Sequence, residues 1–348
     1  MAAIGGGTAL TLADWAKRVD DDGKTAIIVE LLSQYNPILD EMLIVEGNLP
    51  TGHKTTVRTS LPAVSLRPLN QGVQPSKSTT AQIVEGISNM EAYSQVDKDL
   101  ADLHGDTAEF RMSEDMSFVE SLNQQMANLL FYGNPYSGNP AEFLGFTGRY
   151  NATSSTTSQS ADNVIDAGGT GSTNASIWTV GWGPNTIAGI FPKGKLSGLQ
   201  HIDMGEWPVL DAANGLYQAY RTHFKWELGL SVRDWRFGVR IANIDTTLLN
   251  GSSAPNLINA LIRAVNRLPI QPSSAGPIQD SDAPRPLVYN MCAIYCNRVI
   301  RTALDLQAVN KTNLLLRIDE WAGKPVLTFR GIPVRNADAL LSTETRVT

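Results

Sequence analysis

The chain has 348 residues, of which 42% are hydrophobic and 18% are charged, and its formal net charge at pH 7 is −6. This length can bury the core of one large domain or of two interleaved domains, and the composition is that of a folded protein rather than a disordered one. The negative charge argues against a dedicated nucleic-acid-binding domain, which usually carries a basic excess on one face, but it leaves nonspecific contact open.

The cysteine count and the N-terminal sequence indicate the cellular compartment in which the protein is expected. Only Cys292 and Cys296 occur, which excludes a disulfide-stapled secreted scaffold and fits a reducing interior. Residues 1–9 lack the cationic and apolar regions of a signal peptide, and no segment reaches the roughly 18 apolar residues of a membrane span. We therefore expect a soluble, intracellular protein without a membrane partner.

Helical patterns come first along the chain. Residues 11–43 are predicted to be helical, with Thr11 as an N-cap and Leu12, Trp15 and Val19 at helical spacing. Gly23 interrupts this run, a second helix is expected over residues 25–35, and Pro37 should begin a short turn.

A long arm follows at residues 49–84. Residues 55–61 and 78–87 have strand character, and the prolines and glycine between them predict that the arm folds back near residues 70–72. Each leg of about 17 residues could reach on the order of 50 Å. An isolated ribbon of that length is marginal in water, so the arm is expected to lie on another surface.

The rest of the chain alternates between helical and sheet patterns without an internal repeat. Residues 90–103 are predicted to be helical, Ser113 to cap the longest helix, which ends at Tyr132, and residues 151–176 to form an exposed insertion. The remaining predictions are sheet segments at 177–182, 187–191, 217–244, 287–291, 314–318, 326–329 and 332–334, helices at 255–268 and 297–309, and a Pro-rich link at 269–286. Separated helical and antiparallel segments indicate the α+β class.

Charge is segregated along the chain. Residues 47–84 contain no Asp or Glu, but they carry the four cations Lys54, Arg58, Arg67 and Lys77. Residues 85–120 hold ten acidic residues against two basic ones. We predict that the arm of one subunit lies across the acidic helices of the next, where complementary charge sets the register. The expected acidic partners are Asp97, Asp99, Asp102, Glu109 and Glu114.

Two other interpretations of these charges stay open. They could be solvated surface charges within one domain, or the arm could bind phosphate. The second is weaker, because four dispersed cations without interleaved aromatic residues make a poor nucleic-acid groove.

Catalytic, cofactor and metal motifs are missing. Gly23-Lys24-Thr25 resembles the end of a phosphate-binding loop, but Arg18 stands where the first glycine belongs. The four histidines are scattered, and two cysteines supply too few ligands for structural zinc. The sequence therefore predicts no enzyme, no cofactor and no metal site.

Three long blocks resemble the major capsid proteins of tailed bacteriophages, in particular a family of short-tailed phages. The blocks are LPTGHKTTVRTSLPAVSLRPLNQGVQPSKSTTAQ (49–82), LYQAYRTHFKWELGLSVRDWRFGVRIANID (216–245) and FRGIPVRNADALL (329–341). The resemblance implies the Hong Kong phage 97 type fold. It assigns residues 1–46 to an N-terminal arm, 47–85 to an extended loop, 86–245 to a peripheral domain with a spine helix at 113–132, 246–312 to an axial domain, and 313–348 to return strands.

The resemblance also implies a function. The expected protein is a major capsid protein that forms hexamers and pentamers of an icosahedral shell around double-stranded DNA, assembled in the host cytoplasm as part of the virion. Its expected partners are itself, portal and scaffolding proteins, a decoration protein and, nonspecifically, packaged DNA. A cellular encapsulating compartment of the same fold is the alternative, and an enzyme with an unrecognised site is a remote third.

Overall fold

The structure, a computed structural model, describes residues 10, 12, 14, 32–103, 105–137, 139–154, 156, 158–211, 213–249, 251, 254–269, 292–309, 316–321 and 324–348. The predictions for residues 11–31, for the link at 269–286 and for the strand at 287–291 lie almost wholly outside the described residues. The chain divides into two compact units. Unit 1 comprises Met1–Asn36, Asn89–Asn128 and Leu196–Glu227, and unit 2 comprises Pro37–Ser88, Leu129–Lys195 and Leu228–Thr348.

Unit 2 is built on a mixed sheet of seven strands. In spatial order they are β12 (Leu316–Trp321), β13 (Lys324–Phe329), β14 (Ile332–Asn336), β11 (Cys292–Cys296), β6 (Asn174–Gly181), β10 (Gly238–Asp245) and β5 (Val164–Asp166). Every residue of the interior strand β6 is buried, as expected for a strand covered on both faces. The pairs β10–β5 and β11–β14 are parallel, and the other neighbours are antiparallel.

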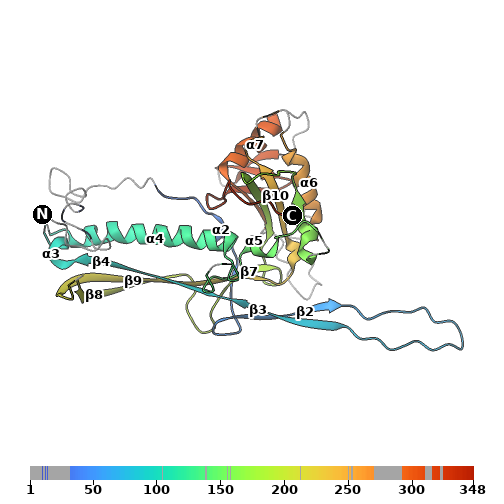
Figure 1. Cartoon of the computed structure of the whole chain (residues 1–348), viewed down its shortest axis with the longest axis horizontal. Helices are drawn as coiled ribbons and strands as arrows, with labels where there is room; N and C mark the ends of the chain where they lie inside the picture. The colour runs from blue at the N-terminus through green and yellow to red at the C-terminus, as the bar shows by residue number, and fades with distance from the viewer. Residues whose placement is uncertain are drawn as a thin grey trace. The chain divides into compact units, whose positions relative to one another are not determined.

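Two amphipathic helices pack on this sheet, near β10 in Figure 1. Helix α6 (Leu257–Arg267) begins at Asn256, whose side chain accepts a hydrogen bond from the Asn259 N–H, and it buries Leu257, Leu261 and Val265. Helix α7 (Arg298–Val309) begins after Asn297, whose Oδ1 accepts the Ile300 N–H at 2.8 Å. These two caps fix the helix starts, and the apolar faces form the core of unit 2 with the sheet.

The remaining elements of unit 2 are short, apart from a two-stranded hairpin. They are α2 (Ile38–Glu41), β1 (Ile44–Glu46), α5 (Phe146–Arg149), η1 (Gln159–Asn163), β7 (Ile187–Phe191), η2 (Trp235–Phe237), and the hairpin strands β2 (Gly52–Ser60) and β3 (Thr79–Gly86). β7 pairs with β1 in parallel and with residues 229–232 of β9 (Leu216–Val232) in antiparallel orientation.

Unit 1 combines a long helix with antiparallel strands. The helix is α4 (Thr107–Tyr132), whose last turn belongs to unit 2, and it follows the short helix α3 (Lys98–Ala101). β9 pairs on one side with β8 (Leu199–Leu210) and on the other with β4 (Ser88–Asp97). Phe118 of α4 stacks on Phe224 of β9 with ring centroids 6.1 Å apart.

Many predicted elements are confirmed with small shifts of their ends. The segment 187–191 is β7, the helices at 255–268 and 297–309 are α6 and α7, and the three closing strands are β12, β13 and β14. The run 217–244 forms two strands, β9 and β10, and Pro37 precedes the short helix α2. Strand β8 was not predicted.

Three predictions are wrong. Residues 90–103 form strand β4 and the short helix α3, because pairing with β9 overrides a helix-like spacing of apolar residues. The long helix begins at Thr107, so Ser113 lies inside it, and its hydroxyl donates to the Phe110 carbonyl. The segment 151–176 is not an exposed insertion, because it contains η1, β5 and the start of β6, and both Ile165 and Ala175 are core residues.

Candidate assembly surface

The predicted arm forms an antiparallel hairpin in unit 2. β2 and β3 pair from Gly52 opposite Gly86 to Arg58 opposite Thr80, and the register then shifts by one residue. The hydroxyls of Thr59 and Ser60 lie 2.8 and 2.7 Å from the Thr79 hydroxyl and close this end of the ladder. The strands are rich in β-branched residues, which favour a pleated ribbon. The expectation of a folded-back arm is confirmed.

The tip of the hairpin, residues 61–78, carries no further strand and is drawn in Figure 1 as a simple connection between β2 and β3. It reverses direction at Asn70, whose φ is +65°, a value that asparagine tolerates better than most residues. Arg67 Nε donates to the Gln71 carbonyl at 2.7 Å, and the Ser76 hydroxyl donates to the Ala63 carbonyl at 2.8 Å. Local polar contacts therefore shape the tip.

The tip exposes apolar side chains to an unusual degree. Leu61, Val64, Leu66 and Leu69 are between 77% and 99% exposed. Single exposed apolar residues are common, but several of them close together in the sequence of one hairpin tip indicate an interaction site. The cations Lys54, Arg58, Arg67 and Lys77 are also exposed, and they are spread along the same hairpin from β2 to the tip.

The root of the hairpin is held by a buried ion pair. Arg149 Nη1 lies 2.7 Å from Glu85 Oε1, and the same oxygen accepts the Val232 N–H at 2.9 Å. Arg149 also donates to the carbonyls of Leu144 and Leu230. Because Glu85 belongs to β3, Arg149 to α5 and Val232 to β9, this contact joins the hairpin to two other elements of unit 2.

The backbones of β9 and β3 also lie close together at the root of the hairpin. A Cβ on Gly229 would lie 2.6 Å from the Gly86 carbonyl oxygen, so only glycine lets β9 approach β3 this closely. His53, opposite Glu85 in the ladder, is buried, and its Nε2 lies 2.8 Å from Arg233 Nη2. The hairpin therefore has a fixed root and an exposed tip.

The five predicted acidic partners lie in unit 1. Asp97 accepts the Asp99 N–H at 2.9 Å and caps α3, and Asp102 Oδ1 accepts the Thr107 hydroxyl at 2.6 Å just before α4. Glu109 is exposed in the first turn of α4, where a negative charge complements the helix dipole, and Glu114 is half-buried. The pairing of these residues with the arm of another subunit stays a prediction.

The root residues Arg149 and Arg233 were not found from the sequence. Nothing in the spacing of these arginines distinguishes them from surface arginines, because Glu85, the partner of Arg149, and His53, the partner of Arg233, are distant in the sequence. The only usable signal was the position of Glu85, which is the first acidic residue after the long stretch without any.

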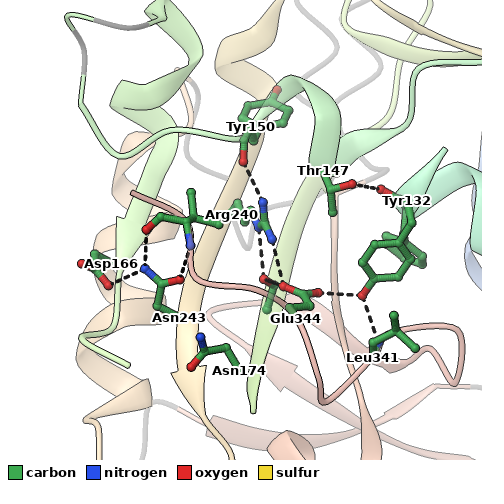
Figure 2. A network of polar contacts seen from close by, with 12 residues as sticks. Tyr132, Thr147, Tyr150, Asp166, Asn174, Arg240, Asn243, Leu341 and Glu344 are labelled. Atoms are coloured by element: carbon green, nitrogen blue, oxygen red, sulfur yellow. Dashed lines mark hydrogen bonds and ion pairs between the residues drawn. The ribbon is translucent and has the colours of Figure 1, made fainter. Parts of the chain in front are cut away.

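A second buried polar network ties the last described residues to the core of unit 2 (Figure 2). Arg240 Nη2 lies 2.8 Å from Glu344 Oε2, and Arg240 also donates to Ser176 and to the Tyr150 carbonyl. The Tyr132 hydroxyl donates to Glu344 Oε1 at 2.6 Å, and burial, followed by the Glu344 charge, raises the pKa of Tyr132. A cavity of about 340 Å³ lies beside this network. Each of the three nitrogens of Arg240 donates to a protein acceptor, which indicates a structural role.

The described residues hold no group of three or more His, Cys, Asp or Glu side chains that could bind a metal ion. His201 and His223 each lie near one carboxylate, that of Asp115 and that of Glu91, whereas His104 lies outside the described residues. Cys296 is buried, and burial raises the pKa of its thiol to about 12. In the described part of the chain, no helix is both long and apolar enough to cross a membrane.

Comparisons with known proteins agree with this architecture. The family model described as "Major capsid protein GP7" matches residues 20–348. A solved structure of bacteriophage Epsilon15, determined by cryo-electron microscopy and modelling, is 34% identical, with a TM-score of 0.77 and all of both chains covered. No curated protein matches.

Two further solved structures are more distant. The bacteriophage JBD30 capsid is 10% identical with a TM-score of 0.45, covering 91% of this chain and 96% of the other. The capsid of a native GTA particle is 8% identical with a TM-score of 0.45, covering 66% and 97%.

The family match extends over nearly the whole chain, and the Epsilon15 structure shares its fold from end to end. The fold is the mixed helix and sheet capsid fold of the Hong Kong phage 97 type. The chain therefore belongs to the major capsid protein GP7 family, and it is a structural subunit of the icosahedral shell of a phage virion, not an enzyme.

Proposed function

We propose that the hairpin at residues 47–85 is the extended loop with which one capsid subunit holds the next. In this proposal Lys54, Arg58, Arg67 and Lys77 face Asp97, Asp99, Asp102, Glu109 and Glu114 of a neighbouring subunit. The observation that carries the proposal is the contrast within the hairpin between a buried, ion-paired root and a tip of exposed leucines without any acidic residue.

Apolar and charged groups would play different parts in this contact. Burial of apolar surface contributes about 25 cal/mol per Å², so the leucines of the tip would supply most of the affinity. An exposed ion pair is worth only about 0–1 kcal/mol, and the four cations would mainly set register and exclude wrong partners. The same small contact, repeated around a closed shell, can hold many subunits together.

We also propose the division of the chain that the family resemblance implies. Residues 1–46 are the N-terminal arm, residues 86–245 the peripheral domain with α4 as its spine helix, residues 246–312 the axial domain, and residues 313–348 its return strands. The continuous course of α4 from Thr107 to Tyr132 supports the assignment of the spine helix.

The proposed assembly consists of hexamers and pentamers of this chain that surround double-stranded DNA. Portal, scaffolding and decoration proteins are its proposed partners, and contact with DNA is nonspecific. A net charge of −6 supports the last point, because it disfavours a dedicated DNA-binding surface.

The proposed clasp is tested by replacing Arg58 and Arg67 together with Glu. Both side chains are exposed, so the subunit should fold normally, with an unchanged thermal unfolding midpoint. We expect the yield of closed shells, counted by electron microscopy, to fall at least about tenfold, because like charges would face each other between subunits. Lys193→Glu with Lys195→Glu, the same change of charge at an exposed loop of unit 2, is the matched control.

A compensating variant makes the test specific. Asp102→Arg with Glu109→Arg, added to the reversed arm, should restore part of the shell yield if these residues face each other. Normal shells from the arm reversal alone would refute the proposed role of the charges.

A further inference from the structure

Three arginines of unit 2 lie on or beside the C-terminal half of α6. Arg263 and Arg267 are one helical turn apart and share a face, Arg263 being exposed and Arg267 half-buried. Arg330, in the turn between β13 and β14, donates from Nη1 to Asn266 Oδ1 at 3.3 Å and so reaches the same end of the helix. We call Arg263, Arg267 and Arg330 the arginine patch.

The backbone at Arg330 is strained. Phe329 pairs with Ile332, so Arg330 and Gly331 form a two-residue hairpin turn, and their φ angles are +52° and +80°. Two positive φ values define a turn in which Asn-Gly is the preferred sequence. An arginine in the left-handed region is uncommon, and such strain gathers at functional positions. For folding alone, asparagine would therefore suit position 330 better than arginine does.

The arginine patch has no ion-pair partner in the described part of the chain. Burial first, and then the charge of Arg263, lower the pKa of Arg267, and the exposed Asp162 acts in the opposite direction. A structural role explains part of the patch, because Arg267 donates to the Val164 carbonyl at 3.1 Å and cations suit a helix C-terminus. It does not explain Arg263, which is exposed, or the strain at Arg330.

We propose that the arginine patch is a contact site for carboxylates of a second copy of this chain, separate from the hairpin. Since the protein assembles into a shell, each subunit lies against other copies, and a chain with 34 acidic and 28 basic residues supplies more carboxylates than cations for such contacts. Planar guanidinium groups bind carboxylates with two parallel hydrogen bonds. Duplex DNA fits less well, because the chain as a whole repels it.

The variant Arg330→Asn separates folding from assembly. Asparagine suits the turn, so the thermal unfolding midpoint of the isolated subunit should stay equal or rise. The subunit concentration needed for half-maximal shell formation should rise roughly fivefold, since the lost contact is that of an exposed charge pair. Lys193→Asn, which removes one positive charge elsewhere on unit 2, should change neither quantity.

Cross-linking identifies the partner. In assembled shells of the Arg330→Lys variant, a carbodiimide should join the introduced amine to an Asp or Glu, and mixed light and heavy subunits reveal by mass spectrometry whether the link crosses between chains. Arg298→Lys is the control, since Arg298 pairs with Asp338 in its own chain at 2.7 Å.

Three outcomes would overturn the proposal. They are unchanged assembly of the Arg330→Asn variant, a cross-link only to Asp162 of the same chain, and shells that form normally but bind a short DNA duplex more weakly. The last outcome would assign the arginine patch to nucleic acid instead.

Discussion

Arg149 and Glu85 form an ion pair whose side chains are only 15% and 3% exposed, and the pair fixes strand β3 to helix α5 at the root of the hairpin. Removing one member of a buried pair leaves a charge without a counterion, which usually costs about 3–5 kcal/mol. Arg149→Met should therefore lower the free energy of unfolding of the subunit by about that amount in urea titrations. The double variant with Glu85→Gln should recover part of the loss, and a single variant that unfolds like the parent would show the pair to be dispensable.

Glu344 is predicted to be equally important for the closing segment of the chain. Its carboxylate pairs with Arg240 and accepts the Tyr132 hydroxyl, and all these groups are largely buried. Glu344→Gln keeps the shape but removes the charge, so Arg240 stays buried without a counterion. We expect a loss of about 3–5 kcal/mol in the free energy of unfolding, recovered in part by Arg240→Met in the same chain. Full additivity of the two changes would show that the residues do not interact.

The packing of β9 against the hairpin gives a prediction with an internal control. Gly229→Ala would place a Cβ 2.6 Å from the Gly86 carbonyl oxygen and should cost about 1–3 kcal/mol of stability. Gly72→Ala, in the tip, meets no atom within 4 Å and should leave the unfolding midpoint almost unchanged. Equal effects of the two substitutions would contradict the close approach at the root.

His53 should make the root of the hairpin sensitive to acid. Burial first, and then the positive charge of Arg233, lower the pKa of His53 below its ordinary value of 6.5, while Glu85 acts in the opposite direction. The groups that face the ring are Arg233, Glu85 and the Asn48 N–H, which lies 3.3 Å from Nδ1. Because the folded protein disfavours the protonated ring, its contribution to stability is complete above pH 6.5 and is lost as the pH falls through the lowered pKa.

The measurement is the free energy of unfolding of the isolated subunit between pH 8 and pH 5, compared with that of His53→Gln. The parent should lose more stability than the variant over this range. Parallel curves would show that His53 does not titrate differently in the folded and unfolded chain.

The hairpin and helix α6 could be predicted because local pattern and final structure agree in them. In α6, Leu257, Leu261 and Val265 recur at helical spacing and all are buried against the sheet. In the hairpin, prolines and β-branched residues leave few alternatives to a bent ribbon.

Strand β4 could not be predicted, because its structure depends on distant partners. Tyr93 stacks on His223 with ring centroids 4.5 Å apart, and Lys225 lies 3.0 Å from Glu91. These cross-strand contacts stabilise a strand in a segment whose apolar spacing suits a helix.

The prediction of an exposed insertion at residues 151–176 failed for another reason. Some polar side chains there are buried and hydrogen-bonded, as when Asn163 donates to the carbonyls of Gly238 and Arg236 at 2.9 and 3.0 Å. Composition does not distinguish such residues from those of an exposed loop. The same limit hid the root residues Arg149 and Arg233.

The exposed leucines of the tip also affect the subunit before assembly. Leu66 is 99% and Leu69 93% exposed, so a newly synthesised subunit has an apolar surface that can aggregate with other apolar surfaces. The side chains that would stabilise the finished shell are therefore also those that make the unassembled subunit prone to aggregation. Efficient phage production would depend on keeping the free pool small, either by rapid incorporation or by a companion protein that shields the tip until a neighbour takes its place.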